Sequence, residues 1–335
     1  MSYWGDRANE RMASYHRGAD STINKINAAY DKAIEEINKD INKIFFKFQN
    51  DSGLSIAEAK AFLNSKVSKK EIESIRARIK YIKDENLRRT LMAEMNANAY
   101  SARITRLEAL KESIRINSTK VADVELAEST KLFTNTLNKA YFEKCFDIQS
   151  EIKMFFNVAE MDKKLIEQIL KSKWSGNNYS KLIWKNNEAF IQKLEEVLTS
   201  GFMKGTSIRK MAKEMEQFTK YGKFATERLI RTETTYIANA ADMEAYKECG
   251  IERYIFLATL DLRTSKQCQD MDSEIVRVDK AVPGENLPPL HPYCRSTTRS
   301  YYKDIERVRI ARGADGKTYT VKDINYHEWY DTYAA

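Results

Sequence analysis

The sequence predicts a mostly helical protein that ends in a small C-terminal α+β domain. All four prolines of the 335-residue chain lie within positions 283–292, so proline interrupts no helix before them. Only three glycines precede Gly176. After Gly250, helical periodicity gives way to β-branched and aromatic runs typical of strands. We therefore expect a long-helix N-terminal body over residues 1–170 and a small mixed unit with β-hairpins over residues 171–335.

The N-terminal body begins with a predicted helix that is almost unbroken from Trp4 to Phe48. Isoleucine and alanine recur there at spacings of three and four, which gives one apolar stripe. Ser55-Ile-Ala-Glu58 and Ser68-Lys-Lys-Glu71 both fit the capping box, so each predicts the start of another helix.

Helical pattern then continues to about Asn157, with breaks expected near Asp84–Asn86 and at Asn117–Ser118. The polar run Trp174–Ser180 predicts a loop.

Two more helices are predicted, one around Ile183–Leu198 and one over residues 221–249. Between them, Gly201 and Gly205 fit a helix C-cap and a tight turn.

The C-terminal part carries the strand signals. Residues 253–259 and 274–278 are strand candidates, and the runs 307–310 and 317–321 flank an Asp-Gly pair that predicts a hairpin turn. The aromatic tail at 326–333 is expected to form a short helix that docks on this unit.

The proline-rich run 282–298 can be neither helix nor central strand, because proline fixes φ and lacks a backbone donor. We expect a stiff, extended loop that holds His291, Cys294 and Arg295 in nearly fixed directions. Other polar residues should join them: Arg231, Glu233, Asp261, Arg263, Cys268, Asp270 and Asp272. His16 and His327 are expected to be surface or packing residues.

Three interpretations of this constellation remain open. In the first, Arg263, Arg231 and Arg295 pair with Asp261, Glu233 and Asp272 in a buried polar network, and removing Arg263 would cost roughly 3–5 kcal/mol. In the second, a structural zinc ion is bound by Cys268, His291, Cys294 and the carboxylate of Asp272. In the third, the constellation at 261–295 is the site of a metal- or Cys/His-dependent hydrolase or transferase.

The positive charge of the chain is concentrated in one segment. Net charge is +8, and residues 60–120 hold 15 Lys and Arg against 7 Asp and Glu. Such a segment favours a polyanionic partner such as double-stranded DNA, bound without sequence preference, although a solvated helix face is the alternative. The candidate contact residues are Lys66, Lys69, Lys70, Arg76, Arg78, Lys80, Lys83, Arg88, Arg89, Arg103 and Arg106.

Two functional classes are disfavoured by composition. No stretch approaches the roughly 18–20 apolar residues that a membrane-spanning helix needs, so we expect no membrane partner. Four cysteines in a chain of this length do not make a disulfide framework, which favours folding in the reducing cytoplasm.

The ordered motifs of the C-terminal half resemble the phage Mu protein F-like family. The resemblance is carried by Gly201-x-x-x-Gly205-x-Ser207, Arg231-Thr-Glu233, Asp261-x-Arg263-Thr264 with Cys268 and Asp272, and Pro288-Pro-x-His291-Pro-x-Cys294-Arg295-Ser296. Many relatives have cysteine where this chain has Ser265 and Ser296, so a cysteine-only metal shell is not expected here.

The resemblance implies a minor head, or head morphogenesis, protein of a tailed phage. It implies a structural component of the virion, made in the host cytoplasm and located inside the capsid near the portal, that supports head assembly and DNA packaging or ejection. Expected partners are the portal protein, double-stranded DNA, and capsid or scaffolding protein. The family's shared domain implies no enzymatic activity and no catalytic residues.

Overall fold

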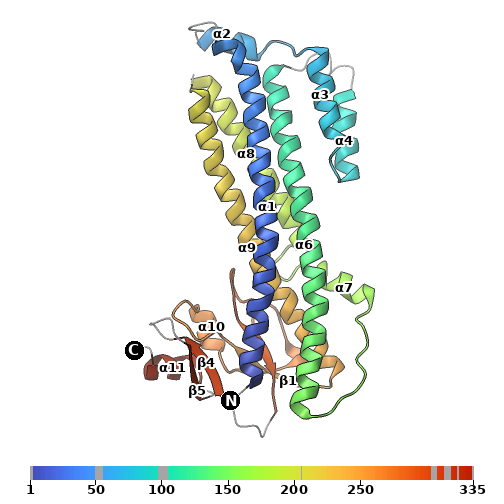
Figure 1. Cartoon of the computed structure of the whole chain (residues 1–335), viewed down its shortest axis with the longest axis vertical. Coiled ribbons are helices and arrows are strands. Elements are labelled where there is room, and N and C mark those ends of the chain that lie inside the picture. The colour runs from blue at the N-terminus through green and yellow to red at the C-terminus, as the bar shows by residue number, and fades with distance from the viewer. Residues whose placement is uncertain are drawn as a thin grey trace. The chain divides into compact units, whose positions relative to one another are not determined.

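The computed structural model describes residues 3–49, 56–96, 105–204, 206–302, 308–312, 318–322 and 324–333. Its helices and strands confirm the predicted class of long N-terminal helices followed by a small mixed unit (Figure 1). The helices before the first strand are α1 (Tyr3–Gln49), α2 (Ile56–Leu63), α3 (Lys69–Ile79), α4 (Glu85–Asn96), α6 (Arg106–Ile152), α7 (Lys163–Leu170), α8 (Tyr179–Lys204) and α9 (Ile208–Glu248). They are followed by β1 (Arg253–Leu257), α10 (Lys266–Met271), β2 (Ile275–Arg277), a 3-10 turn (Val278–Lys280), β3 (Thr297–Ser300), β4 (Val308–Arg312), β5 (Thr318–Lys322) and α11 (Tyr326–Tyr333).

Contacts within the chain divide it into two compact, discontinuous units. Unit 1 comprises Met1–Thr22, Ser129–Tyr179 and Glu227–Ala335, and unit 2 comprises Ile23–Glu128 and Ser180–Thr226. Each unit therefore takes residues from both sides of the predicted boundary between residues 170 and 171. That boundary, as a division between a partner-facing body and a C-terminal domain, stays a prediction.

Unit 2 is helical, and one of its cores lies between α3, α4 and the first part of α6. Ile72, Ile75 and Ile79 of α3 pack there against Leu91 of α4 and Ile116 of α6. The predicted capping box at Ser68 and Glu71 is present, since each side chain binds the backbone N–H of the other residue. The predicted break near Asp84–Asn86 is also present, between α3 and α4.

Two local predictions in unit 2 are wrong. α6 runs through Asn117–Ser118, because Asn117 Nδ2 donates to the Ser113 carbonyl at 3.0 Å and both side chains are buried within the helix. Gly201 lies inside α8 rather than at its cap, and a Cβ built there would stand 2.2 Å from the Met211 sulfur. The glycine therefore serves close packing against α9. Gly205 lies outside the described residues.

Unit 1 contains a three-stranded antiparallel sheet in the order β2-β1-β3, with β1 in the centre. Tyr254 of β1 is buried with Tyr246 of α9 and Ile148 of α6, and the two tyrosine rings are stacked at 6.2 Å. The predicted strands at 253–259 and 274–278 thus appear as β1 and β2.

The predicted hairpin and tail helix are also found in unit 1. β4 and β5 pair antiparallel, while the Asp315-Gly316 turn lies outside the described residues. Trp329 and Tyr326 of α11 are buried against Leu260 and Ala311, so the aromatic tail docks on the mixed unit as predicted.

β3 was not predicted, because its sequence, Thr-Thr-Arg-Ser, has neither apolar alternation nor β-branched apolar residues. All four of its residues are buried, and they meet polar partners. Lys144 Nζ donates to the Thr298 carbonyl at 2.8 Å and pairs with Asp242 at 2.8 Å. Among the described helices, none is long and apolar enough to span a bilayer.

Candidate functional site

Three metal-ligand side chains meet beneath the proline-rich loop of unit 1. Ser265 caps α10 by accepting from the Cys268 N–H at 3.4 Å, which fixes Cys268 in the first turn. The loop brings the other two residues to it: Cys268 Sγ lies 3.3 Å from His291 Nε2 and 3.6 Å from Cys294 Sγ. All three ligand atoms lie within 4.8 Å of one another. We call these residues the thiol-histidine cluster.

The imidazole of this cluster is held in one orientation. His291 Nδ1 lies 2.7 Å from the Pro292 carbonyl oxygen and donates to it, which leaves the Nε2 lone pair directed at the thiols. The hydrogen bond to Cys294 raises the pKa of His291, against the effect of burial. The hydrogen bond from Cys268 lowers the pKa of Cys294, although burial opposes it. The cluster therefore favours a Cys294 thiolate.

The geometry fits a tetrahedral zinc ion. With Zn–S near 2.3 Å and Zn–N near 2.0–2.1 Å, neighbouring ligand atoms stand roughly 3.5–3.8 Å apart, close to the separations in the cluster. Asp272, the predicted fourth ligand, is not in the cluster. Its Oδ1 accepts from the Ala258 N–H at 2.8 Å, so this carboxylate closes the end of β1.

Asp261 organises the arginines beside the cluster. Its carboxylate forms a bidentate pair with Arg295, at 2.6 and 2.8 Å, and also accepts from the Arg263 N–H at 3.0 Å. Burial acts to raise the pKa of Asp261, but the hydrogen bonds from Arg295 outweigh it and hold the pKa below its usual value.

Arg263 forms an ion pair with Asp261, as predicted, but not the buried bidentate pair that was expected. Its side chain is 79% exposed, and its Nε lies as far as 3.9 Å from Asp261 Oδ2, because Arg295 already binds that carboxylate. The expectation that removing Arg263 costs several kcal/mol is therefore withdrawn, since an exposed pair at that distance contributes little.

Arg231 and Glu233 are also not partners. Arg231 donates to Glu227 at 2.9 Å and to Asp20 at 2.6 Å. Glu233 faces the other way and accepts from Trp174 Nε1 at 3.2 Å with both oxygens. Side chains two residues apart on a helix point in different directions, so the order of residues in the motif does not imply that its arginine contacts its glutamate.

Sequence reasoning missed how α1 and α9 reach the proline-rich loop. Thr235 Oγ1 of α9 donates to the Cys294 carbonyl at 2.7 Å and lies 3.2 Å from His16 Nε2 of α1. Burial lowers the pKa of His16 to about 4, so this ring is neutral. His16 and Thr235 are 219 positions apart and no local pattern signals their contact. His327, by contrast, is exposed and pairs with Asp270 at 3.3 Å.

The predicted basic segment divides by residue type. In the described part of unit 2, its arginines are engaged within the fold: Arg76 with the Met95 carbonyl, Arg78 with Asp40, Arg88 with the Ile82 carbonyl, Arg89 with Glu85 and Arg106 with Ser65. Arg103 lies outside the described residues.

Lysines form the outward part of the same segment. Lys69 and Lys70 at the start of α3 are exposed, as are Lys80 and Lys83 just after its end and Lys66 shortly before it. Tyr81, between the second pair, is 78% exposed. We call Lys69, Lys70, Lys80 and Lys83 the lysine surface.

A thiol nucleophile finds little support in this geometry. Cys268 is 1% exposed and Cys294 fully buried, so a substrate carbonyl could not reach either sulfur without opening the loop. Two nearby carboxylates that could serve in acid–base catalysis are engaged elsewhere, Asp261 with Arg295 and Asp270 with His327. The cluster is built like a structural site.

Comparison with known proteins gives one match. Residues 192–299 match the family model described as Phage Mu protein F like protein. This segment is Mu protein F-like. The match spans the motifs from Gly201 to Ser296, and it supports a phage head protein, as the resemblance implied. No curated protein and no solved structure matches the chain significantly.

Proposed function

We propose that this Mu F-like protein is a minor head protein that lies inside the phage head, associates with the portal ring, and supports genome packaging or ejection. The observation that carries the proposal is the family match over residues 192–299. This segment includes all three residues of the thiol-histidine cluster. Capsid or scaffolding protein is a further partner during assembly in the host cytoplasm.

The site geometry supports a structural role. The cluster, the Asp261–Arg295 pair and the contact of Thr235 with the Cys294 carbonyl together fix the proline-rich loop against α9 and β1. These contacts hold the loop in a single conformation, and a fixed surface of this kind suits a structural protein that binds the same partner in one orientation.

Co-expression with the portal protein of the same phage tests the proposed association. We expect the two proteins to elute together in size-exclusion chromatography, with this chain bound to the portal ring. A portal protein from an unrelated phage serves as the control. Separate elution from the cognate portal at micromolar concentrations would contradict the association.

We also propose that the thiol-histidine cluster holds a structural zinc ion. Two sulfurs and one fixed imidazole nitrogen are ligands that zinc prefers, and the hydrogen bond from His291 Nδ1 to the Pro292 carbonyl is the usual support of a zinc-bound histidine. Bound there, the ion would join α10 to the proline-rich loop.

Metal analysis of the purified full-length protein checks this. We expect about one zinc per chain, its loss in Cys294→Ser and His291→Ala, and its retention in Cys249→Ser, which changes a half-buried cysteine outside the cluster. In the wild type, a chelator should lower the unfolding temperature and added zinc restore it. Metal-free protein whose unfolding temperature ignores both additions would rule the ion out.

A further inference from the structure

Unit 1 contains a large cavity that borders the thiol-histidine cluster at His291 and whose open volume has no part in the roles above. Its volume is about 1050 Å³, comparable to the pockets that hold small organic ligands, which occupy roughly 300–1,000 Å³. Its walls come from four stretches: the part of α1 from Asn9 to Asp20, the turn of α9 with Glu227 and Arg231, the segment after β1, and the proline-rich loop from His291 to Arg295. The cavity therefore exists only in the folded unit.

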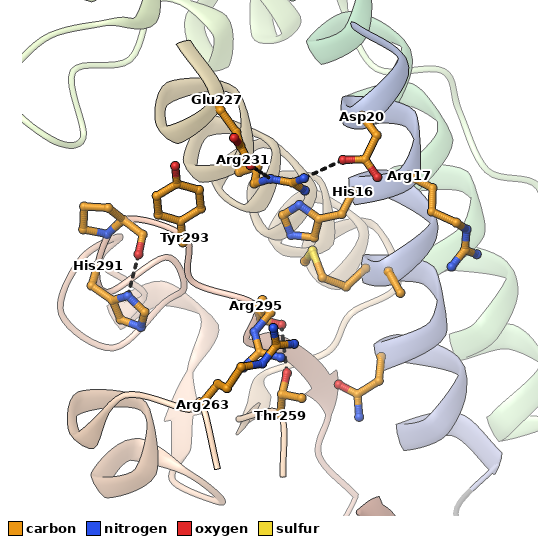
Figure 2. Close-up of a pocket in the computed structure, with 14 residues that line it drawn as sticks. His16, Arg17, Asp20, Glu227, Arg231, Thr259, Arg263, His291, Tyr293 and Arg295 are labelled. Atoms are coloured by element: carbon orange, nitrogen blue, oxygen red, sulfur yellow. Dashed lines mark hydrogen bonds and ion pairs between the residues drawn. The ribbon is translucent and has the colours of Figure 1, made fainter. Parts of the chain in front are cut away.

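Arginines dominate the charge of the cavity wall. Arg17, Arg231, Arg263 and Arg295 line it, against the two carboxylates Asp20 and Glu227. Arg263 and Arg295 both approach Asp261 Oδ2, at 3.9 and 2.6 Å, and Figure 2 shows Arg231 on another wall of the cavity. Guanidinium groups placed together in this way suit an oxyanion, since each offers a planar pair of donors.

Two of these arginines are held in place and two are available. Asp20 and Glu227 hold Arg231, while Asp261 holds Arg295. Arg263 is 79% exposed, and its backbone is fixed because its N–H donates to Asp261. Arg17 is exposed and makes no ion pair with the residues that the structure describes. The cavity thus offers two exposed guanidinium groups, that of Arg17 and that of Arg263, whose ion pair with Asp261 is long at 3.9 Å.

An aromatic ring and two unused acceptors accompany the charge. Tyr293 lines the cavity with its backbone at φ 61°, a conformation uncommon outside glycine, and its N–H donates to Thr232 Oγ1 at 3.1 Å. Asn9 Oδ1 and His16 Nδ1, both in lining residues, are buried without a hydrogen-bond partner among the described residues. Buried polar atoms are rarely left so, and these two could accept from hydroxyl or amino groups.

We infer that this cavity binds a nucleotide unit, with its phosphate at Arg263, Arg295 and Arg17 and its base against Tyr293. Donors for an oxyanion, a ring for stacking and acceptors for sugar or base groups match the three chemical parts of a nucleotide. The source is a free nucleotide or the 5′-terminal unit of a DNA strand. The inference stands apart from the lysine surface, because all lining residues belong to unit 1.

Calorimetric titration of the full-length protein tests the inference. The probes are deoxyadenosine monophosphate, inorganic phosphate, and one short single-stranded oligonucleotide carrying either a 5′-phosphate or a 5′-hydroxyl. We expect the mononucleotide to bind and Arg263→Ala to weaken it at least about tenfold without changing the unfolding temperature. Arg277→Ala removes another exposed arginine, which lies outside the cavity, and should leave the affinity unchanged.

A second variant separates the base from the phosphate. Tyr293→Asn removes the ring, while asparagine tolerates the positive φ. It should weaken mononucleotide binding about tenfold and phosphate binding less than twofold. Tighter binding of the 5′-phosphorylated strand than of the mononucleotide identifies a DNA end as the source, and binding of the mononucleotide but neither strand identifies the free nucleotide. No heat with any probe at millimolar concentration, or equal affinity in wild type and Arg263→Ala, overturns the inference.

Discussion

Glu233 is a carboxylic acid that folding removes almost completely from water. Its side chain lies on α9 and is 4% exposed, and both oxygens accept from a single donor, Trp174 Nε1. Burial raises its pKa from 4.5 to about 7, because one indole N–H does not replace the hydration of a carboxylate. At neutral pH the folded protein therefore holds this group partly protonated.

A pH dependence of stability follows from Glu233. Because the pKa of Glu233 is raised in the folded state, the stability that its protonated form contributes is fully present below about pH 4.5. This stability is lost as pH rises through about 7. Glu233→Gln keeps an acceptor for Trp174 but carries no charge, so we expect it to be about 2–3 kcal/mol more stable than wild type at pH 8 and equal to it at pH 4.5. Urea unfolding at several pH values measures this.

The control for Glu233 is Glu248→Gln, an exposed position on the same helix, which should follow the wild-type curve at every pH. If the free energy of unfolding depended on pH in the same way for wild type and Glu233→Gln, ionisation of Glu233 would not destabilise the folded protein.

At the residue scale, the sequence could predict which side chains gather but not which ones pair. The proline-stiffened loop and the strand end brought Cys268, His291 and Cys294 together as expected. The partner of Asp261 depended on a turn that points the Arg263 backbone, rather than its guanidinium, at the carboxylate. Such a choice is made by a few backbone angles that the residue types leave open.

At the element scale, a buried ion pair ties α6, α9 and β3 together in unit 1. Lys144 of α6 and Asp242 of α9 lie 2.8 Å apart with 8% of each side chain exposed, and Thr298 of β3 binds both. A charge enclosed in this way is costly to leave without its partner. The polar strand β3 therefore packs in unit 1 through hydrogen bonds with both α6 and α9.

Lys144→Met is expected to lower the free energy of unfolding by about 3–5 kcal/mol, because it leaves Asp242 buried and unpaired. The double variant Lys144→Met, Asp242→Leu should recover most of that loss, since neither charge remains. Chemical denaturation measures both. The matched control is Lys247→Met, which removes the exposed partner of Glu244 on α9 and should change stability by less than about 1 kcal/mol.

A loss of stability in Lys144→Met no greater than in that control would mean that water reaches the Lys144–Asp242 pair.

The same pair explains why sequence reasoning overlooked β3. Strand prediction relies on apolar alternation, whereas this strand is buried through threonine and serine hydroxyls that meet a lysine and an aspartate from distant helices. Long helices and capping boxes were predictable because their signals are local.

At the scale of the whole molecule, the division of the basic segment between engaged arginines and exposed lysines bears on DNA binding. Arg76, Arg78 and Arg88 are bound to carbonyls or to a carboxylate, so little of their charge is available. If the DNA contact expected from the sequence forms, the lysine surface is the part of this segment with charge available for it. Its lysines lie at the two ends of α3, an 11-residue helix about 16 Å long, and that length spans several phosphates of one strand.

Replacing the four residues of the lysine surface with glutamine should weaken binding to double-stranded DNA and make it less salt-dependent. Each phosphate contact contributes about 0.9 to the slope of log affinity against log salt, so we expect the slope to fall by up to about 3–4. Fluorescence anisotropy with duplexes of unrelated sequence measures it. The control replaces four other exposed lysines of unit 2, namely Lys185, Lys204, Lys210 and Lys213. Equal slopes in the two variants would remove the lysine surface from the proposed interface.

The two compact units are built from interleaved stretches of the chain, three in unit 1 and two in unit 2. All four changes between units fall inside helices: in α1 after residue 22, in α6 after residue 128, in α8 after its first residue, 179, and in α9 after residue 226. No single uninterrupted piece of the gene therefore encodes either unit. A single crossover after residue 22, 128, 179 or 226 would combine residues of two parents within unit 1, so its core would have to pack from two different sequences.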